Sequence, residues 1–315
     1  MAFYIEAIKR SRIIAAILLL ALLTSCAVVP TLPSVVQVPR QISEAPLFIE
    51  DRPVIAFVLG SGAARGFAHV GVLNTLEEHG IVADIVVGTS AGSVVGSLYC
   101  GGIRGQALVT AAHQLDIKQL TDWVVPNRGV VRGQRLQLYV NGLLNYRPIE
   151  ALQTKFIAVA TDLLDGDLVA FNQGDTGMAT RASSAIPGLI QPVMINGREY
   201  VDGGLVSQVP VRVARQMGAD VIIAVDVSKN PFKPEQLQST FAVMQQAIII
   251  MSHKLAETEV GEADILIRPD VGGIAVAEFE LRDQAVAAGE AATLAVIPEI
   301  VQLIAEKSWQ KRQPE

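Results

Sequence analysis

The stretch that decides the fold runs from Asp84 to Ser97 and reads DIVVGTSAGSVVGS. A short apolar run leads into the pentapeptide Gly88-Thr89-Ser90-Ala91-Gly92, and small and apolar residues follow it. This order predicts a strand, a sharp turn with Ser90 at its apex, and a helix. A turn this tight strains the serine and needs small neighbours, which Gly88 and Gly92 supply. Ser90 is therefore a candidate nucleophile at a helix N-terminus, where backbone N–H groups favour developing negative charge.

The segments around this elbow predict a mainly parallel sheet. Residues 54–59 (VIAFVL) form a continuous apolar run of strand length, and a Gly-rich loop and a helical pattern over 67–79 follow. Further apolar runs at 156–160, 221–225 and 265–267 alternate with helical stretches, the last three of which are expected over 241–259, 281–288 and about 291–306. Continuous apolar strands of this kind are typical of a parallel sheet with helices on both faces. The pattern is less regular over residues 101–148, which we expect to form an excursion over the active face on the substrate side. No repeat or break divides the chain, so we expect one α/β domain over residues 52–315.

Three interpretations compete for the Gly-rich loop at residues 60–66 (GSGAARG). A dinucleotide fingerprint requires G-x-G-x-x-G, but Arg65 stands at the sixth position. A P-loop requires a final Gly-Lys-Ser/Thr, which is absent. The third interpretation is an oxyanion hole, whose backbone N–H groups approach a tetrahedral intermediate near Ser90. We prefer the third, with Arg65 either holding the loop, attracting a phosphate head group, or forming a surface salt bridge.

The first 25 residues read as a signal peptide. Three basic residues precede an apolar run over 13–23, which is shorter than the roughly 20 residues that span a bilayer. The sequence Leu23-Thr24-Ser25-Cys26 resembles the lipobox of bacterial lipoproteins, which implies cleavage before Cys26 and acylation of Cys26. The alternatives are an uncleaved anchor or a plain signal with an incidental cysteine. Residues 26–51 then form a tether, and Cys100 is a small buried residue.

The resemblance to bacterial lipoproteins implies a protein of the bacterial cell envelope that is lipid-anchored and faces the periplasm. Ala27, and not Asp, follows the cysteine, which in that family implies the outer membrane as the expected destination. The net charge is −6 and no basic block is present, which argues against a nucleic-acid partner. The expected partners are the membrane, through lipidated Cys26, and a membrane lipid as substrate. Protein partners stay undefined.

A serine nucleophile needs a base. The chain has four histidines, at 69, 79, 113 and 253, and only His253, with Asp226, fits the order of an α/β-hydrolase triad. His69 fits a core or capping role better. Asp202 is the stronger candidate, because it ends the second strand of a hairpin that Asn196-Gly197 predicts. Two glycines follow it and leave room for an approaching side chain. No two histidines share helix spacing with a carboxylate, so we expect neither a metal site nor a cofactor.

Four stretches occur together and in a fixed order: LGSGAARGFAHVGVL (59–73), VGTSAG (87–92), RASSAIPGL (181–189) and YVDGGLVSQVPV (200–211). In these stretches and in their order the chain resembles the patatin-like phospholipases, closest to the bacterial members related to neuropathy target esterase. The resemblance implies a three-layer patatin-like fold and a Ser90–Asp202 dyad that needs no histidine. It also implies an oxyanion hole from the backbone of Gly62, Ala63 and Ala64, and ester hydrolysis without calcium.

Two departures from the family pattern stand out. Ser61 and Ala63 occupy loop positions where many members carry Gly, and Ser207 stands where Asn is common. The first bears on which N–H groups form the oxyanion hole, and the second on local hydrogen bonding. We therefore expect a serine hydrolase acting on phospholipids or lysophospholipids. The rivals are a transacylase on the same dyad and a non-catalytic lipid-binding or scaffold lipoprotein.

Overall fold

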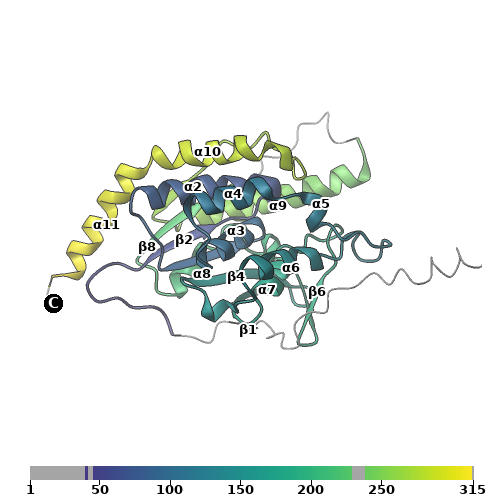
Figure 1. Ribbon diagram of the computed structural model, residues 1–315, viewed down its shortest axis with the longest axis horizontal. Helices are drawn as coiled ribbons and strands as arrows, with labels where there is room; N and C mark the ends of the chain where they lie inside the picture. The colour runs from purple at the N-terminus through teal and green to yellow at the C-terminus, as the bar shows by residue number, and fades with distance from the viewer. Residues whose placement is uncertain (1–39, 42–44, 229–237, 314–315) are drawn as a thin grey trace, which may run out of the picture. The chain divides into compact units, whose positions relative to one another are not determined.

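One mixed sheet organises the chain (Figure 1). The structure is a computed structural model and describes residues 40–41, 45–228 and 238–313. Within these residues the strand order is β1-β5-β4-β3-β2-β8-β9, with β7 beside β4 and β6 beside β7. The parallel strands, in spatial order, are β4 (Lys155–Asp162), β3 (Ile85–Thr89), β2 (Ile55–Leu59), β8 (Val221–Val225) and β9 (Ile265–Ile267).

The middle strands are buried on both faces, as their continuous apolar sequences predict. The antiparallel strands lie toward one edge: β1 (Arg40–Gln41), β5 (Leu168–Gln173), β6 (Val193–Ile195) and β7 (Arg198–Asp202). The predicted hairpin at Asn196-Gly197 is confirmed, because both residues adopt positive φ and join β6 to β7.

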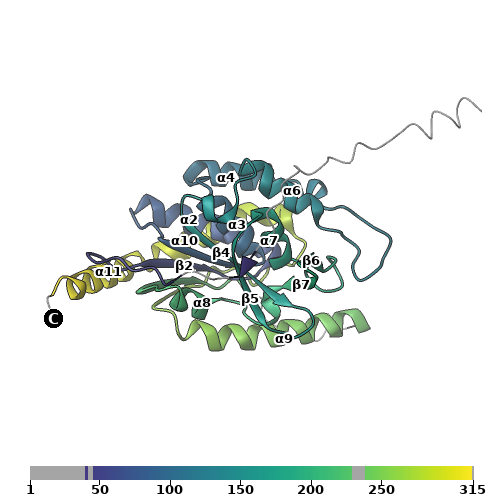
Figure 2. The same ribbon diagram turned by 90° about the horizontal axis from the view of Figure 1, so that it is seen from below.

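Helices cover both faces of the sheet, so the predicted three-layer α/β fold is confirmed (Figures 1 and 2). One face carries α2 (Ala68–Glu78), α3 (Ala91–Cys100), α4 (Gly105–Gln114), α6 (Gln134–Leu143), α7 (Thr176–Ser183) and α10 (Arg282–Leu294). The other face carries α8 (Val211–Gln216) and the long helix α9 (Thr240–Val260). The chain closes with α11 (Ile297–Lys311). Cys100, predicted to be buried, is fully buried as a free thiol.

Residues that the sequence predicts as tether lie on the folded body. Residues 40–41 form β1 against β5, and the Leu47 N–H donates to the Met217 carbonyl at 2.8 Å. The predicted domain boundary at residue 52 is therefore too late, because an extended segment without periodicity looks the same whether it docks on a sheet or not. The predicted signal segment 1–25 and Cys26 lie outside the described residues.

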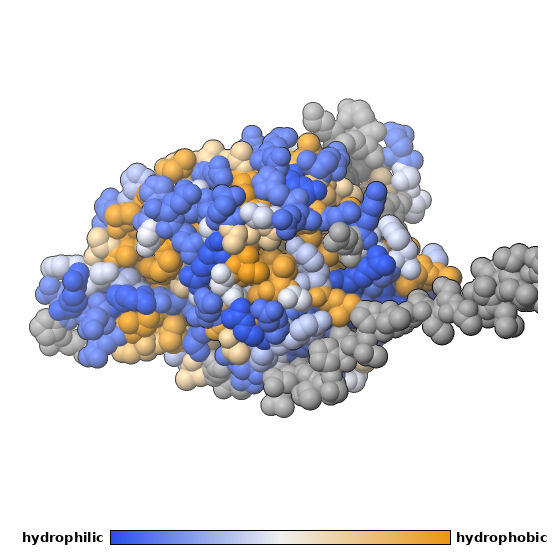
Figure 3. Space-filling model, viewed as in Figure 1, coloured by the Kyte–Doolittle hydropathy of each residue, from blue (hydrophilic) through white to orange (hydrophobic). Residues whose placement is uncertain are grey.

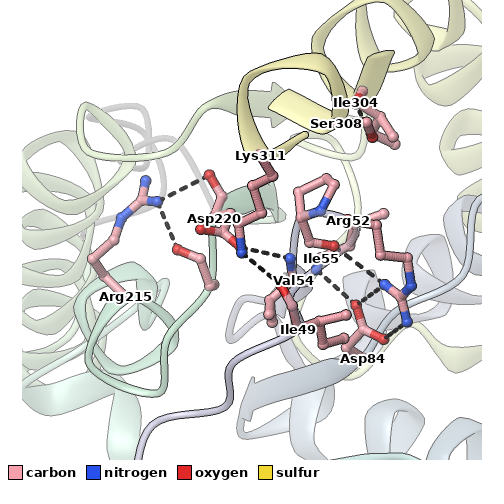
Figure 4. A network of polar contacts seen from close by, with 12 residues as sticks. Ile49, Arg52, Val54, Ile55, Asp84, Arg215, Asp220, Ile304, Ser308 and Lys311 are labelled. Atoms are coloured by element: carbon pink, nitrogen blue, oxygen red, sulfur yellow. Dashed lines mark hydrogen bonds and ion pairs between the residues drawn. The ribbon is translucent and has the colours of Figure 1, made fainter. Parts of the chain in front are cut away.

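A polar network fixes the chain where it enters β2 (Figure 4). The Lys311 ammonium pairs with Asp220 at 2.7 Å and donates to the Ile49 carbonyl at 3.0 Å. The Asp220 carboxylate also accepts the Val54 N–H at 2.7 Å. These bonds link the entering chain, the start of β8 and the last helix at the amino ends of the parallel strands, opposite the end that carries Ser90.

The region over residues 101–148, whose pattern is irregular in sequence, forms α4, the short α5 (Ile117–Leu120) and α6. The two C-terminal helices also differ from their predicted spans of 281–288 and 291–306, because the break falls at residues 295–296. Within the described ranges no single helix has the length and apolar composition of a membrane span; the pair Phe279–Leu294 and Ile297–Lys311 meets both criteria only across a 51° bend.

Candidate active site

The predicted elbow is confirmed. Ser90 lies between β3 and α3 with φ 55° and ψ −121°, a conformation that non-glycine residues rarely adopt. The turn closes because Gly92 packs on the backbone of β2: a Cβ there would lie 2.0 Å from the Leu59 carbonyl oxygen. The strand before the turn and the helix after it thus hold Ser90 in place at the N-terminus of α3.

The sheet topology brings Asp202 to Ser90. Strand β3 occupies one edge of β4 as far as Val159, which pairs with Thr89. Because β5 fills the opposite edge over Ala158–Thr161, β7 continues along the edge that β3 leaves, pairing Asp202 with Ala160. Asp202 therefore lies just beyond the end of β3, where Ser90 begins the turn. Two residues 112 positions apart in sequence meet in this way.

Ser90 and Asp202 are hydrogen-bonded, with Ser90 Oγ donating to Asp202 Oδ2 at 2.6 Å. The Gly204 N–H donates to Asp202 Oδ1 at 2.8 Å and fixes the orientation of the carboxylate. Both side chains are buried, and burial raises the pKa of Asp202 to about 6. Gly203, which the sequence suggests leaves room for a side chain, instead packs on β4, where a Cβ would lie 2.3 Å from the Val159 carbonyl oxygen.

Ser183 was not singled out by the sequence, although it lies within the quoted stretch RASSAIPGL. Its hydroxyl accepts the Ser90 N–H at 2.9 Å and donates to the Val159 carbonyl at 2.6 Å. The residue therefore ties the strained elbow to the end of β4. The sequence signal was only a small residue near the end of a helix, and its partner becomes clear only from the packing of α7 against the sheet.

The Gly-rich loop follows β2 and lies at the same end of the sheet as Ser90, as two adjacent parallel strands require. Within the described residues, the N–H groups of Gly62 and Ala63 have no hydrogen-bond acceptor, and Ala63 adopts φ 49°. The Ala64 N–H, also predicted for the oxyanion hole, donates to the Val276 carbonyl at 3.3 Å. Gly62 and Ala63 are thus the two predicted donors that are free to bind an oxyanion.

Arg65 holds the loop, which is one of the three roles that the sequence allows. Its side chain is buried, and its guanidinium donates to the carbonyls of Val227 at 2.8 Å and Ile274 at 3.3 Å. Burial lowers the pKa of Arg65 to about 10. The side chain is therefore neither a surface salt bridge nor exposed to a head group, and it links the Gly-rich loop to the segments after β8 and β9.

The histidine alternative finds no support. His253 pairs with Glu257 along α9 at 3.4 Å, and Asp226 pairs with Arg268 at 3.1 Å. His69 has the predicted core role, since its ring bonds the Gly60 carbonyl at 2.8 Å and burial lowers its pKa to about 4. The remaining histidines contact groups away from the elbow: His79 bonds the Thr75 carbonyl, and His113 pairs with Asp283.

Ser207, which stands where Asn is common in the family pattern, finds hydrogen-bond partners nearby. The Ser207 hydroxyl donates to the Glu259 carboxylate of α9, and its carbonyl accepts the Thr89 hydroxyl at 3.1 Å. Glu259 also accepts the Val209 N–H at 2.9 Å. This turn therefore has its hydrogen bonds satisfied without an asparagine.

A cavity of about 330 Å³ opens beside Ser90. Apolar side chains from α3, from residues 115–136 and from residues 186–190 and 276–279 form most of its wall. The expected excursion of residues 101–148 over the active face is therefore confirmed. Few of the lining residues have polar side chains, namely Ser90, Thr121 and Ser184. The buried Ser184 hydroxyl has no partner within the described chain, so it can bond a polar atom of a ligand.

Comparison with known proteins agrees with this geometry. The family model described as patatin-like phospholipase matches residues 57–215. An uncharacterized NTE family protein of Mycobacterium tuberculosis is 36% identical over 184 residues, which cover 58% of this chain and 51% of that protein. A lysophospholipase of Meyerozyma guilliermondii is 34% identical over 179 residues, covering 55% of this chain and 12% of that protein. The chain thus spans about half the length of its mycobacterial relatives.

The fold is also similar to the crystal structure of VipD from Legionella pneumophila, with a TM-score of 0.52, 15% identity, and coverage of 89% of this chain and 72% of that one. The family model covers half of the sequence and includes the elbow, the Gly-rich loop and Asp202. The sequence motifs, the topology and the family model therefore agree, and this chain belongs to the patatin-like phospholipase family.

Proposed function

We propose that the chain is a serine lipid acyl hydrolase that cleaves carboxylic esters of phospholipids or lysophospholipids through a Ser90–Asp202 dyad. The observation that carries the proposal is the 2.6 Å hydrogen bond between these buried side chains, at the head of an apolar cavity. Membership of the family supports ester chemistry, and the relative named lysophospholipase supports a lipid substrate. An apolar wall favours an acyl chain over a charged head group as its occupant.

Acylation of Ser90 is the first step of the proposed reaction. Ser90 Oγ attacks the ester carbonyl while its proton passes to Asp202 Oδ2, and the carbonyl oxygen becomes an oxyanion. The N–H groups of Gly62 and Ala63, with that of Ala91 at the start of α3, supply hydrogen bonds for this charge. When the tetrahedral intermediate collapses, the C–O bond to the leaving alcohol breaks and Asp202 returns the proton to that oxygen.

Deacylation repeats the cycle with water. Asp202 takes a proton from water, which attacks the acyl-Ser90 carbonyl, and the proton returns to Ser90 Oγ as the fatty acid leaves. Water and a second alcohol differ only as acceptors at this step. A transacylase therefore uses the same residues and differs in what enters the cavity mouth.

Product analysis tests the proposal. The purified chain is incubated with phospholipid or lysophospholipid vesicles, with and without glycerol or a lysophospholipid as acceptor. We expect free fatty acid in amounts that match the lysolipid or glycerophosphodiester formed. Acyl transfer to the acceptor at the expense of fatty acid would establish the transacylase instead. If no lipid ester gives any product, the chain is better explained as a non-catalytic lipoprotein.

The pH dependence of kcat/KM follows from Asp202. Because the base acts as a carboxylate and burial raises its pKa to about 6, kcat/KM should fall tenfold per pH unit below that value, about 100-fold at pH 4. A histidine base would give a similar midpoint, so the profile is measured at two temperatures. The midpoint of a carboxyl hardly moves with temperature, whereas that of an imidazole does. A midpoint that moves like an imidazole would contradict the dyad.

We also propose the lipid anchor at Cys26, which rests on the sequence alone. Several acyl chains on the processed N-terminus would hold the enzyme at the surface where its substrate is concentrated. Metabolic incorporation of a labelled fatty acid that disappears in Cys26→Ser would support the anchor, and fractionation would test the expected outer-membrane location. Equal labelling of both proteins would exclude it.

A further inference from the structure

The cavity of the candidate site opens among exposed apolar side chains. Trp123 lines the cavity and yet is 70% exposed, so it stands at the mouth. Leu189 does the same, and Val125 and Met194 are exposed on neighbouring segments. We call Trp123, Val125, Leu189 and Met194 the apolar rim. Scattered exposed apolar residues are ordinary, but a group around a substrate entrance marks an interaction surface.

The first half of α9 carries a second group of exposed apolar side chains. Residues 240–252 carry no Asp, Glu, Lys or Arg, and their exposed apolar side chains recur at helical spacing: Val243, Met244, Ala247, Ile248, Ile250 and Met251. Figures 1 and 2 both place this half of α9 at the same end of the body as β6 and the segment between α5 and α6. Figure 3 shows apolar side chains on the surface at that end.

The charges beside the rim have the opposite sign to those of the whole chain. Residues 116–135 carry four basic side chains and two acidic ones, whereas the net charge of the chain is −6. Arg128 pairs with Glu199 at 2.7 Å, but no carboxylate of the described residues pairs with Lys118, Arg132 or Arg135. Exposed tryptophan beside unpaired cations is typical of segments that lie at the head-group level of an anionic membrane.

The predicted anchor permits this orientation. From Cys26 to Arg40, where β1 begins, the 14 residue steps reach roughly 50 Å when extended, at ~3.3–3.6 Å each. This reach exceeds the ~30 Å of a bilayer core and is comparable to the size of a small domain, so the tether does not force the mouth away from the membrane.

We propose that the apolar rim and the first half of α9 dock on an anionic phospholipid bilayer, so that an acyl chain passes from the bilayer into the cavity without crossing water. The delivery of an acyl chain to the cavity rests on the proposed lipid hydrolase function. The docking is argued independently, from the exposure, position and charge of the residues described above. A second copy of this chain is the other occupant that an apolar helix face could take.

Tryptophan fluorescence tests the docking on the full chain. The sequence has two tryptophans, Trp123 at the rim and Trp309, which is 63% exposed on α11. Three single-tryptophan proteins are made in the Ser90→Ala background: Trp309→Phe, Trp123→Phe, and Trp123→Phe/Trp309→Phe/Met244→Trp. Each is reconstituted in anionic vesicles whose acyl chains are brominated, which quenches only tryptophans that reach the bilayer.

We expect quenching of Trp123 and of the tryptophan at position 244 by about half or more, and little quenching of Trp309. Equal quenching of all three, or none at the rim, would overturn the proposal. Because Ser90→Ala removes catalysis, this result does not depend on whether the chain hydrolyses lipid. If neither tryptophan is quenched and the protein forms a dimer through α9, the surface would instead bind a second copy of the chain.

Activity gives an independent readout. Val125→Asp places a charge on the rim outside the cavity wall, and Val301→Asp is the matched control on α11, where Val301 is 50% exposed. We expect Val125→Asp to lower hydrolysis of vesicle lipid about tenfold, equivalent to ~1.4 kcal/mol, and to leave hydrolysis of a short soluble ester unchanged. Equal losses in both variants, or equal losses on both substrates, would contradict a docking role. Absence of hydrolysis in the unmodified chain would count against the proposed function, with the quenching result still standing.

Discussion

Ser90→Ala and Asp202→Asn are each expected to lower hydrolysis of a soluble ester by about 10³-fold or more, because one removes the nucleophile and the other the base. Asn keeps the size of Asp202, and its carbonyl oxygen can still accept the Gly204 N–H, but its amide NH2 then faces Ser90 and takes no proton from the hydroxyl. His253→Ala serves as the control and should keep its activity, since His253 contacts Glu257 on α9. The measurement is kcat/KM for all three variants.

Thermal unfolding shows whether Asp202→Asn is folded, and the raised pKa of Asp202 predicts the direction in which the unfolding temperature changes. The pKa of Asp202 is raised from 3.8 to about 6, so ionising it costs the native state ~3 kcal/mol at high pH. Its contribution to stability is fully present below the unfolded pKa and is lost as the pH rises through 6. Asn carries no charge, so the variant should unfold at a higher temperature than the wild type at pH 8 but not at pH 4.

Loss of activity in His253→Ala, with activity retained in Asp202→Asn, would replace the dyad by a triad. Loss in all three variants would point to a shared structural defect instead, and the unfolding temperatures would reveal it. Only the combination of inactive Ser90→Ala and Asp202→Asn with active His253→Ala agrees with the hydrogen bond between Ser90 and Asp202.

Gly92→Ala is expected to destabilise the protein by about 4 kcal/mol or more. The added Cβ would lie 2.0 Å from the Leu59 carbonyl oxygen and 2.5 Å from its carbon, so α3 and β2 have to separate. Neither partner is a flexible side chain that can move aside. At roughly 2–4 °C per kcal/mol for a domain of this size, Tm should fall by about 10 °C.

Gly142→Ala is the matched control, because Gly142 also lies in a helix but a Cβ there meets nothing within 4 Å. The change removes backbone freedom from the unfolded chain and should stabilise by up to ~1 kcal/mol. Thermal unfolding of both variants against the wild type gives the comparison. A Gly92→Ala protein as stable as Gly142→Ala would mean that the helix does not approach the strand as closely as the geometry requires.

Much of this fold could be predicted because each central strand can be recognised from its own sequence. A strand buried on both faces has to be apolar throughout, which is why β2, β3 and β8 are readable without their neighbours. The elbow could be predicted in the same way, since a strained turn between strand and helix restricts the residues beside Ser90 to small ones. The signal there is steric and confined to a few consecutive positions.

Helix α6 shows where local signals fail. Its N-terminus is capped by a distant side chain, because Asp122 accepts the N–H groups of Gly133 at 2.6 Å and Gln134 at 2.8 Å. Gly133 itself adopts φ 80°. A cap supplied from eleven residues upstream leaves no start signal in the helix sequence. The break between α10 and α11 had a local signal, Pro298 in the first turn of α11, inside the span predicted as one helix.

In the candidate site, too, some features could be predicted from local sequence and others depend on distant segments. The sequence alone favours Asp202 as the base, but its contact with Ser90 depends on β7 taking the edge of β4 that β3 leaves. The bond from the Ser90 N–H to Ser183, and the Ala64 N–H that is already bonded to Val276, are likewise set by packing between distant segments. Residue types could be predicted, whereas the hydrogen bonds that decide their roles could not.

The central claim is that Asp202, without an imidazole, activates Ser90. The most direct measurement is labelling by a fluorophosphonate, which forms a covalent adduct with an activated serine, followed by mass spectrometry of the peptides. We predict an adduct on Ser90 in the wild type and in His253→Ala, and slowed labelling by about 10²-fold or more in Asp202→Asn. An adduct on another serine, or labelling of Ser90 that survives Asp202→Asn and disappears in His253→Ala, would contradict this account.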